Sequence, residues 1–341
     1  MARERPRVQI GLALSGMAQE PQGADMGPRV ADLIEWVRRA RDLGFDYVYT
    51  GQHFLTAPYQ SLQPIPLAAR LAAESGDMGL LITLLLPLLH PVDLAETLST
   101  LDWLTDGRLM VNAARGYRDE EFAAFGVEPS QAARRMTECL RCLLALWSGE
   151  PVTFHGRHYD LDGAVLGLRP KQRPHPPVWV SANADAAVLR AARFGLPWNI
   201  NPHSDLPTIS RQIDRYREAA SEAGQDPDVP LPLERELCCA PQRSEALATA
   251  AAYLGPKYAT YRSWGQERVL PEGDEFADDF ESLARDRFVI GTPSECAADL
   301  ERYLELGVGA VHVRPFWPGM PEPEARRSLE LFAREVAPRL R

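Results

Sequence analysis

Short runs of apolar and β-branched residues alternate along the chain with longer stretches whose apolar residues recur at helical spacing. In the segment 29–44, for example, Val30, Leu33, Ile34 and Val37 fall on one helical face. Eight strand and helix pairs of this kind follow one another along the chain. This alternation is typical of parallel strands covered by helices, so the sequence predicts an α/β fold.

The predicted elements are bounded by proline, glycine or small polar residues. Strands are predicted at residues 8–16, 47–53, 80–87, 109–116, 178–183, 198–203, 233–240 and 309–316. Helices are predicted at 29–44, 64–75, 91–105, 130–148, 185–194, 206–223, from 244, at 292–307 and from 323. Eight strands that are each buried on both faces close more naturally into a (β/α)8 TIM barrel than into an open sheet.

Two stretches interrupt this rhythm. Residues 149–177, with several glycines and a proline-rich end, are predicted as an irregular insertion before strand 5. Residues 254–290 are predicted as a second insertion, before the last helix of the barrel. Insertions on a barrel usually carry function as lids or partner surfaces. Neither is predicted to be a separate domain, so residues 1–341 are expected to form a single barrel domain.

Two local signals mark helix ends. Gly44 is placed as a C-terminal cap, where a left-handed backbone is commonly needed. The run from Thr292 to Glu295 has the pattern of a capping box, with proline at the first helical position. A helix is therefore predicted to begin there.

Composition and charge narrow the class of protein. The 341 residues are 45% hydrophobic and 25% charged, which is ordinary for a folded protein. The net charge of −10 gives no basic field, so no general binding of nucleic acid is expected. The longest apolar run, 78–89, contains Thr83 and Pro87 and is too short for a membrane span, so no membrane association is expected.

The five cysteines are spaced too unevenly for a disulfide framework. No secretion signal is recognised, and a reducing cytoplasm is the expected location. Cys139 and Cys142 lie in the middle of a predicted helix without a second ligand pair, so we expect core packing and no metal site.

A barrel carries its active site at the C-terminal ends of its strands. The polar residues predicted there are amides, hydroxyls, histidines and arginines with few carboxylates. They include Ser15, Gln52, His53, Thr83, Asn112, Arg115, Ser181, Asn183, Asn199, Asn201, His203, Glu234, Glu236 and Arg314. This set suits an anionic, hydrogen-bonding ligand better than a metal. The acidic residues 119–121 are expected in the first turn of a helix, where they would interact favourably with the helix dipole.

Two positions could hold a phosphate. Arg115 follows a strand directly, and Gly116 beside it permits close approach to the bidentate guanidinium. The helix that opens at Asp185 offers free backbone N–H groups, although Asp185 could instead cap that helix. Because neither a dinucleotide fingerprint nor a P-loop motif is present, the chain is not expected to carry its own nicotinamide-cofactor domain.

Several segments, which together span nearly the whole chain, resemble the bacterial luciferase-like flavin-dependent monooxygenase family. They are residues 44–54 (GFDYVYTGQHF), 84–109, 112–127 (NAARGYRDEEFAAFGV), 173–182, 190–197 and 287–300. The resemblance implies a barrel that holds FMN, or in sister groups a deazaflavin. It also implies that a homodimer is common.

Site residues are carried over from this resemblance. Arg115 matches the family's phosphate-binding arginine, and Arg134 on the long helix matches a second one. Asn183 and Ala184 fall on the phosphate loop after strand 5, where the usual hydroxyl side chains are missing. Backbone N–H groups and arginine would therefore have to hold the anion.

The remaining carried-over residues lie near the flavin ring. Thr83 falls beneath the ring, where the family often has a cis peptide bond, here between Ile82 and Thr83. Asn112, at the end of the next strand, is a further predicted cofactor contact. Gln52 stands where the luciferases have their catalytic histidine. His53 beside it is the predicted proton donor or hydrogen-bond partner.

Gln52, Trp198 and His203 are predicted to line the substrate site, although Trp198 could equally belong to the core. The leading hypothesis is an FMN-dependent monooxygenase that oxidises a small organic substrate with molecular oxygen. Its reduced FMN would come from a separate NAD(P)H:flavin reductase. Two alternatives are a deazaflavin-dependent dehydrogenase or reductase without oxygen chemistry and a flavin-binding barrel without catalysis.

Overall fold

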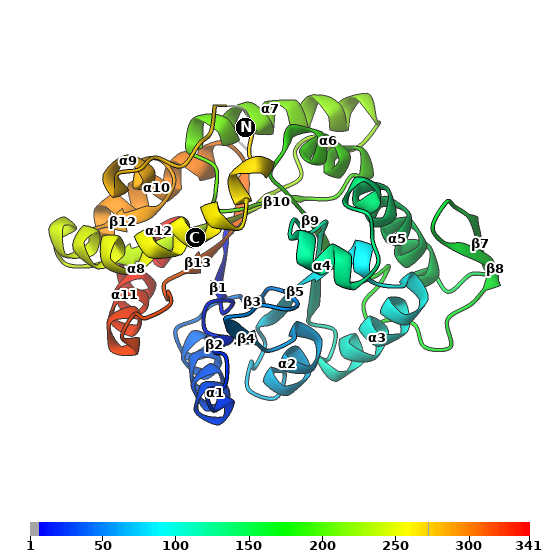
Figure 1. Ribbon diagram of the computed structural model, residues 1–341, viewed down its shortest axis with the longest axis horizontal. Helices are drawn as coiled ribbons and strands as arrows, with labels where there is room; N and C mark the ends of the chain where they lie inside the picture. The colour runs from blue at the N-terminus through cyan, green and yellow to red at the C-terminus, as the bar shows by residue number, and fades with distance from the viewer. Residues whose placement is uncertain (1–6, 272) are drawn as a thin grey trace. The chain divides into compact units, whose positions relative to one another are not determined.

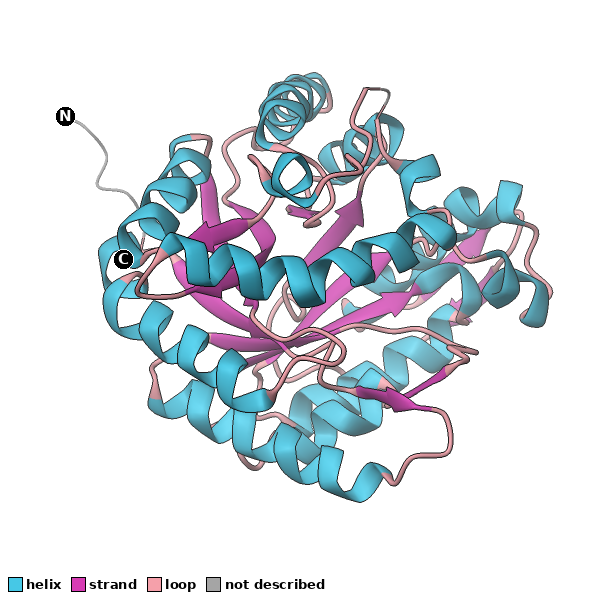
Figure 2. Cartoon of the chain, turned by 60° about the vertical axis from the view of Figure 1, so that its left-hand side comes forward, coloured by secondary structure: helices cyan, strands magenta, loops and turns pink. Residues whose placement is uncertain are grey.

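The computed structural model describes residues 7–271 and 273–341. Its main sheet has nine strands, and β10 pairs additionally with β11. The fold is the predicted α/β class, a closed (β/α)8 barrel of parallel strands with surrounding helices. Figure 1 labels the helices and strands along the chain, and Figure 2 distinguishes helices, strands and loops by colour.

All eight predicted strands are present, most of them shorter than predicted. The strands of the main sheet are β1 (Gln9–Ala13), β3 (Tyr47–Thr50), β5 (Gly79–Leu85), β6 (Leu109–Ala114), β9 (Val178–Ala182), β10 (Trp198–Ile200), β11 (Leu231–Cys239), β12 (Val289–Gly291) and β13 (Val308–Arg314). The short pairs are β2 (Gln19–Pro21) with β4 (Tyr59–Ser61) and β7 (Val152–His155) with β8 (Asp160–Ala164).

The helices also follow the predicted order. They are α1 (Met26–Asp42), α2 (Pro64–Leu71), α3 (Pro91–Leu104), α4 (Asp119–Ala124), α5 (Ala132–Trp147), α6 (Asp185–Phe194), α7 (Leu206–Glu222), α8 (Arg243–Ser263), α9 (Phe280–Ala284), α10 (Pro293–Glu305), α11 (Glu322–Glu335) and α12 (Ala337–Leu340). No described helix is long and apolar enough to cross a membrane.

The chain divides into two compact units. Unit 1 contains the residues up to 17, 42–47 and those from 180 onward, and unit 2 contains 18–41 and 48–179. The single barrel domain expected from the sequence stays a prediction.

Within unit 1, β11 is the central strand. It pairs in parallel with β10, β12 and β13, and β13 pairs with β1. All nine residues of β11 are buried, as expected of a strand covered on both faces. Glu234 lies opposite His312, and Glu236 lies opposite Arg314. Because side chains alternate along a strand, Glu234 and Glu236 share one face.

Within unit 2, β5 and β6 pair in parallel and place Thr83 opposite Asn112. The predicted cis peptide bond between Ile82 and Thr83 is wrong. Among the described residues, the cis bonds are Ala57–Pro58 and Arg173–Pro174. Thr83 instead continues the regular ladder of β5.

The insertion at 149–177 is less irregular than predicted, because it contains the antiparallel hairpin β7–β8. Glu138 on α5 fastens this hairpin, since its carboxylate accepts the backbone N–H groups of Arg157 at 3.2 Å and His158 at 2.8 Å. Figure 1 shows the hairpin beside α5. The prediction failed because a four-residue strand gives almost no periodic signal.

The second insertion also differs from its prediction. Helix α8 continues through Pro256 to Ser263, although proline usually ends a helix. Strand β12 was missed because it has only three residues. Both predicted helix ends are confirmed: Gly44 has a left-handed φ of 78°, and Thr292 and Glu295 form the reciprocal capping box.

Candidate active site

The loop that follows β3 in unit 2 holds a histidine against a buried carboxylate. Nδ1 of His53 lies 3.0 Å from Oε1 of Glu121. The Glu121 side chain is only 2% exposed, whereas that of His53 is 29% exposed. An ionised carboxylate only accepts hydrogen bonds, so this contact favours Nδ1 as the donor and leaves Nε2 directed away from Glu121. The pair can therefore present an oriented imidazole to a reacting molecule.

Glu121 does more than the sequence predicts. Asp119 and Glu120 are exposed in the first turn of α4, as a dipole role requires. Glu121, in contrast, is buried, and it also accepts the backbone N–H of Phe54 at 2.8 Å. Its partner His53 lies 68 residues away along the chain, a contact that no local pattern announces.

Arg118 fixes the same loop from the other side. Its guanidinium donates to the carbonyl of Phe54 at 2.8 Å and to that of Leu55 at 3.2 Å. Its Nη1 also lies 3.7 Å from Oε1 of Glu121. Leu55 has a left-handed φ of 50°, which a leucine adopts only when its surroundings impose it. Arg118 and Glu121 thus determine where His53 stands.

Two predicted cofactor contacts meet inside unit 2. Nδ2 of Asn112 donates to Oγ1 of Thr83 at 2.8 Å, and that hydroxyl donates to the hydroxyl of Tyr49 at 2.9 Å. All three side chains are buried. They form a row of buried polar side chains across β3, β5 and β6. Such a row can recognise the carbonyl and N–H edge of a flat heterocycle.

Gln52, a predicted substrate contact, uses its amide within the protein. Its oxygen accepts the backbone N–H of Leu85 at 2.9 Å, and its Nε2 donates to Gln63 at 3.3 Å. Gln63 in turn donates to the carbonyl of His53 at 2.9 Å. Gln52 therefore connects the loop of His53 to the end of β5.

Arg115 is a half-buried cation without a carboxylate partner among the described residues. Its Nη2 donates to the carbonyl of Pro129 at 3.0 Å, and the guanidinium lies 5.9 Å from the ring centre of Phe122. Burial lowers the pKa of Arg115, and the charge of Asp119 only partly opposes this. A guanidinium in this state retains the capacity to bind an anion.

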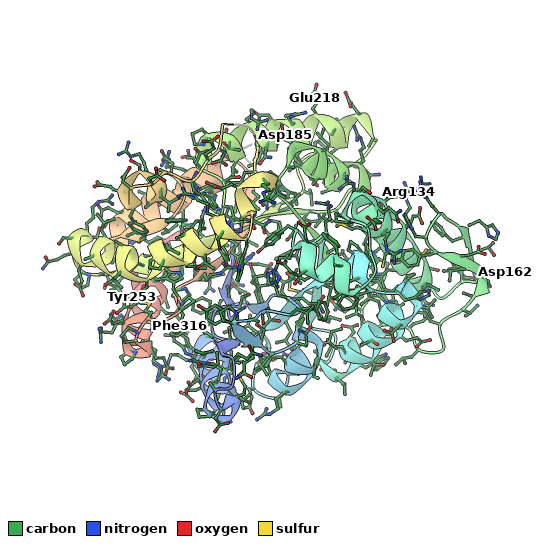
Figure 3. The ribbon with its side chains drawn as sticks, viewed as in Figure 1. Arg134, Asp162, Asp185, Glu218, Tyr253 and Phe316 are labelled. Carbon is green, nitrogen blue, oxygen red and sulfur yellow. The ribbon has the colours of Figure 1, made fainter. Side chains whose placement is uncertain are left out.

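Arg134, the second predicted phosphate contact, is placed differently. It projects from α5 in Figure 3, its side chain is 60% exposed, and its Nε lies 3.0 Å from Glu138. Glu138 is the carboxylate that holds the β7–β8 hairpin. Arg134 would have to exchange this carboxylate for a phosphate in order to bind one.

In unit 1 the predicted phosphate loop leads into α6. Ala184 is the N-terminal cap residue and makes no side-chain hydrogen bond to the helix. The Oδ1 of Asn183 accepts from Asn201 at 2.8 Å, and its backbone carbonyl accepts from Gln212 at 2.7 Å. The loop is thus fixed by two amide side chains. In the first turn of α6, the N–H of Ala187 donates to the carbonyl of Ala184 at 2.9 Å, and the N–H groups before it lie ahead of the helical hydrogen-bond ladder.

The other interpretation, that Asp185 caps its own helix, is not what the structure contains. The Asp185 carboxylate accepts from Arg211 at 2.8 Å and from Gln212 at 2.9 Å, and it also pairs with Arg215. Burial would raise the pKa of Asp185, but the hydrogen bonds from Arg211 and Gln212 lower it overall. Figure 3 labels Asp185 at the start of α6.

Unit 1 also contains a buried network of charged side chains. Oε1 of Glu236 accepts from Lys257 at 2.5 Å and from Arg314 at 3.3 Å, and its Oε2 accepts from Trp317 at 2.6 Å. Arg314 pairs in addition with Glu234. Lys257 lies on α8, within the residues predicted as an insertion. The sequence therefore did not predict its contact with Glu236.

Burial changes the acidity of these groups. It raises the pKa of Glu234, although the charge of Arg314 opposes this. Burial and the charge of Arg314 lower the pKa of Lys257 to about 8. Burial and the charges of Arg314 and Arg235 disfavour the imidazolium form of His312 and lower its pKa to about 3. Its Nδ1 lies 3.0 Å from the hydroxyl oxygen of Tyr47.

The two predicted substrate residues of unit 1 differ in their surroundings. Trp198 is 1% exposed, and its indole N–H donates to the carbonyl of Ala182 at 2.9 Å, which favours the core interpretation. His203 stands in an aromatic cluster, with ring-centre distances of 5.9 Å to Tyr258 and 5.4 Å to Tyr261. Its Nδ1 is buried without a hydrogen-bond partner among the described residues.

No group of His, Cys, Asp and Glu side chains among the described residues is arranged to hold a metal ion. All five cysteines are buried free thiols, including Cys139 and Cys142, for which the sequence predicts core packing. The predicted ligand contacts are mainly amides, hydroxyls, imidazoles and cations, while the buried carboxylates Glu121, Glu234 and Glu236 already have partners. This donor set is suited to an organic, anionic ligand.

Comparisons with known proteins agree with this chemistry. The FMNH(2)-dependent dimethylsulfone monooxygenase of Pseudomonas putida is 26% identical over 98% of this chain and 93% of that protein. The F420-dependent glucose-6-phosphate dehydrogenase of Amycolatopsis mediterranei (strain U-32) is 25% identical over 92% of this chain and 95% of that protein.

A solved structure shares the fold. The oxygenating constituent of 3,6-diketocamphane monooxygenase from Pseudomonas putida, in complex with FMN, has a TM-score of 0.80 at 21% identity, covering 98% of this chain and 99% of that one. Residues 9–310 also match the family model described as luciferase-like monooxygenase. The chain therefore belongs to the luciferase-like monooxygenase family of flavin-dependent oxidoreductases.

Proposed function

We propose that the chain is an FMN-dependent monooxygenase that oxidises a small organic substrate with molecular oxygen. Reduced FMN would be supplied by a separate NAD(P)H:flavin reductase, in keeping with the FMNH(2)-dependent relative. The observation that carries the proposal is Arg115, a half-buried guanidinium without a carboxylate partner among the described residues. The predicted homodimer and cytoplasmic location remain predictions.

The residues present are suited to FMN. Arg115 in unit 2 would bind the phosphate through its guanidinium. In unit 1, the backbone N–H groups at Asn183 and Ala184 are a separate candidate for an anion contact. Thr83 and Asn112 would face the flavin ring, because their hydroxyl and amide form a polar row. Arg134 is a further phosphate contact if it leaves Glu138. Bound reduced FMN supplies the electrons with which oxygen is activated and the substrate oxidised.

The chain's own contribution to the chemistry lies in His53. The contact with Glu121 favours Nδ1 of His53 as the donor, so Nε2 would be available to accept a proton or to orient a polar substrate group. Arg118 and Glu121 keep the loop in place while this occurs. Gln52 is the proposed substrate contact of unit 2, and His203 is that of unit 1. Trp198 contributes by packing.

The second candidate is a deazaflavin-dependent dehydrogenase, which transfers hydride without oxygen. It is favoured by the F420-dependent relative, which matches 92% of this chain, against 98% for the FMNH(2)-dependent one. The His53 and Glu121 pair would serve this reaction equally well, as a base that accepts the hydroxyl proton of an alcohol.

Oxygen reactivity separates the two candidates. The protein is mixed under nitrogen with reduced FMN or with reduced F420, then exposed to oxygen, and reoxidation is followed by absorbance. We expect a saturable, protein-dependent change in the rate at which oxygen oxidises FMN. Binding of F420 without any protein-dependent effect on FMN, together with reduction of F420 by glucose 6-phosphate under nitrogen, would contradict the monooxygenase.

A further inference from the structure

Unit 1 buries more positive than negative charge. Among its described residues, the buried cationic side chains outnumber the buried carboxylates by four to three. The cations are Lys257, Arg235, Arg287 and Arg314, and the carboxylates are Glu234, Glu236 and Asp274. Isolated buried charge is costly, so each of these cations needs compensating contacts.

The excess can be traced to individual pairs. Nη2 of Arg287 lies 2.7 Å from Oδ1 of Asp274. Lys257 and Arg314 both donate to Glu236. Arg314 also pairs with Glu234. Arg235 has no carboxylate partner among the described residues. Its guanidinium donates to the carbonyls of Asn201 at 3.0 Å and Glu234 at 2.9 Å. It also donates to the hydroxyl of Tyr303 at 3.0 Å, and it lies 4.6 Å from the ring centre of that tyrosine. Polar and aromatic contacts, rather than a carboxylate, therefore stabilise its charge.

His203 lies where the fields of these cations meet. Burial, and then the charges of Arg314, Lys257, Arg235 and Arg287, hold the pKa of His203 well below its usual range. The imidazole is therefore neutral and lies in a region of positive potential. Its Nδ1 is buried and has no hydrogen-bond partner in the described part of unit 1. A buried polar atom without a partner is uncommon and is typical of a binding position.

Tyr261 connects His203 to two of the cations. Its ring centre lies 5.4 Å from that of His203, and the ammonium of Lys257 lies 5.5 Å from its ring centre. Its hydroxyl lies 3.5 Å from Nη1 of Arg314. Tyr258 and Phe276 add apolar ring faces around His203. Hydrogen-bond donors, positive potential and flat apolar walls are thus gathered beside a single imidazole.

Lys257 belongs to a residue type that is rare in this chain. The chain has only two lysines, Lys171 and Lys257, against 35 arginines. Lys171 has a 38% exposed side chain, whereas that of Lys257 is 8% exposed. One carboxylate oxygen of Glu236 is its hydrogen-bond partner at 2.5 Å, so the ammonium has further N–H donors to offer.

We propose that unit 1 contains a subsite beside His203 for a negatively charged group of the substrate, with Lys257, Tyr261 and Arg314 as its hydrogen-bond donors. The substrate is then a small organic acid, a carboxylate on a flat or apolar body that the rings of Tyr258 and Phe276 accommodate. Only the statement that this acid is the substrate rests on the proposed function. The subsite rests on the charge and geometry of unit 1.

Benzoate and its neutral isostere benzamide test the subsite by isothermal titration calorimetry on the full chain at fixed salt. We expect benzoate to bind about tenfold or more tightly than benzamide, as a charge-assisted hydrogen bond implies. Lys257→Met should abolish this preference, and Lys171→Met, the other lysine of the chain, should leave it unchanged. Tyr261→Phe removes one hydroxyl and should reduce the preference by about threefold to tenfold.

Equal affinity of the wild type for benzoate and benzamide would overturn the subsite, and so would a preference that survives both Lys257→Met and Tyr261→Phe. Tyr261→Phe keeps the test decisive if Lys257→Met does not fold. Titration of reduced FMN into the same preparations separates the two proposals. FMN binding without a preference for benzoate refutes only the subsite. A preference for benzoate without FMN binding supports the subsite and refutes the proposed function.

Discussion

Replacing Glu236 with alanine is expected to lower the free energy of unfolding by about 3–5 kcal/mol, the range found when one partner of a buried ion pair is removed. The fully buried Glu236 carboxylate accepts hydrogen bonds from Lys257, Arg314 and Trp317. Alanine would leave two cations and an indole N–H in a dry environment without this acceptor. Denaturant-induced unfolding measured at pH 7 gives the difference between wild type and variant.

Glu335→Ala is the matched control for Glu236→Ala. Glu335 lies exposed near the end of α11, also in unit 1. An exposed substitution of this kind should change the free energy of unfolding by less than about 0.5 kcal/mol. If the two variants lose similar stability, the network around Glu236 does not have the energetic importance that its burial implies.

Acid should destabilise the protein through His312. Its pKa is about 3 in the folded chain and 6.5 when unperturbed, because burial and the charges of Arg314 and Arg235 disfavour the imidazolium. Below pH 6.5 the unfolded chain binds a proton that the folded chain does not, so stability present above pH 6.5 is lost as the pH falls toward 3. At about 1.4 kcal/mol per pH unit, the total loss is about 5 kcal/mol.

The measurement is the free energy of unfolding against pH for wild type and His312→Gln. Their difference isolates the histidine from the carboxylates that also titrate in acid. We expect the curves to converge from pH 6.5 downward, because glutamine binds no proton. His155→Gln is the control, since that ring is 71% exposed. Parallel curves for wild type and His312→Gln would show that His312 is protonated freely in the folded state.

The architecture could be predicted because it rests on long periodic signals. The segment 80–87 appears as β5, and the predicted helix 185–194 coincides with α6. Elements of three to five residues, such as β12, lie below the length at which periodicity is informative. Helix α8 continues past Pro256, a residue whose local preference would end the helix.

The site was predictable only where it follows from strand order. Thr83 and Asn112 meet because neighbouring parallel strands end at the same edge, which the sequence already implies. The contact between His53 and Glu121 joins residues 68 positions apart, and it depends on how a short helix is rotated. Lys257 contacts Glu236 from the part of α8 that was predicted to belong to an insertion.

The most direct test of the central claim is the titration of FMN, reduced and oxidised, into wild type and Arg115→Ala. The claim is that Arg115 binds the phosphate of a flavin. We expect Arg115→Ala to lose about 1.5–3 kcal/mol of binding free energy, the range of a hydrogen bond to a charged group. Arg141→Ala, on the exposed side of α5, should bind as the wild type does. An unchanged affinity in Arg115→Ala would contradict the account.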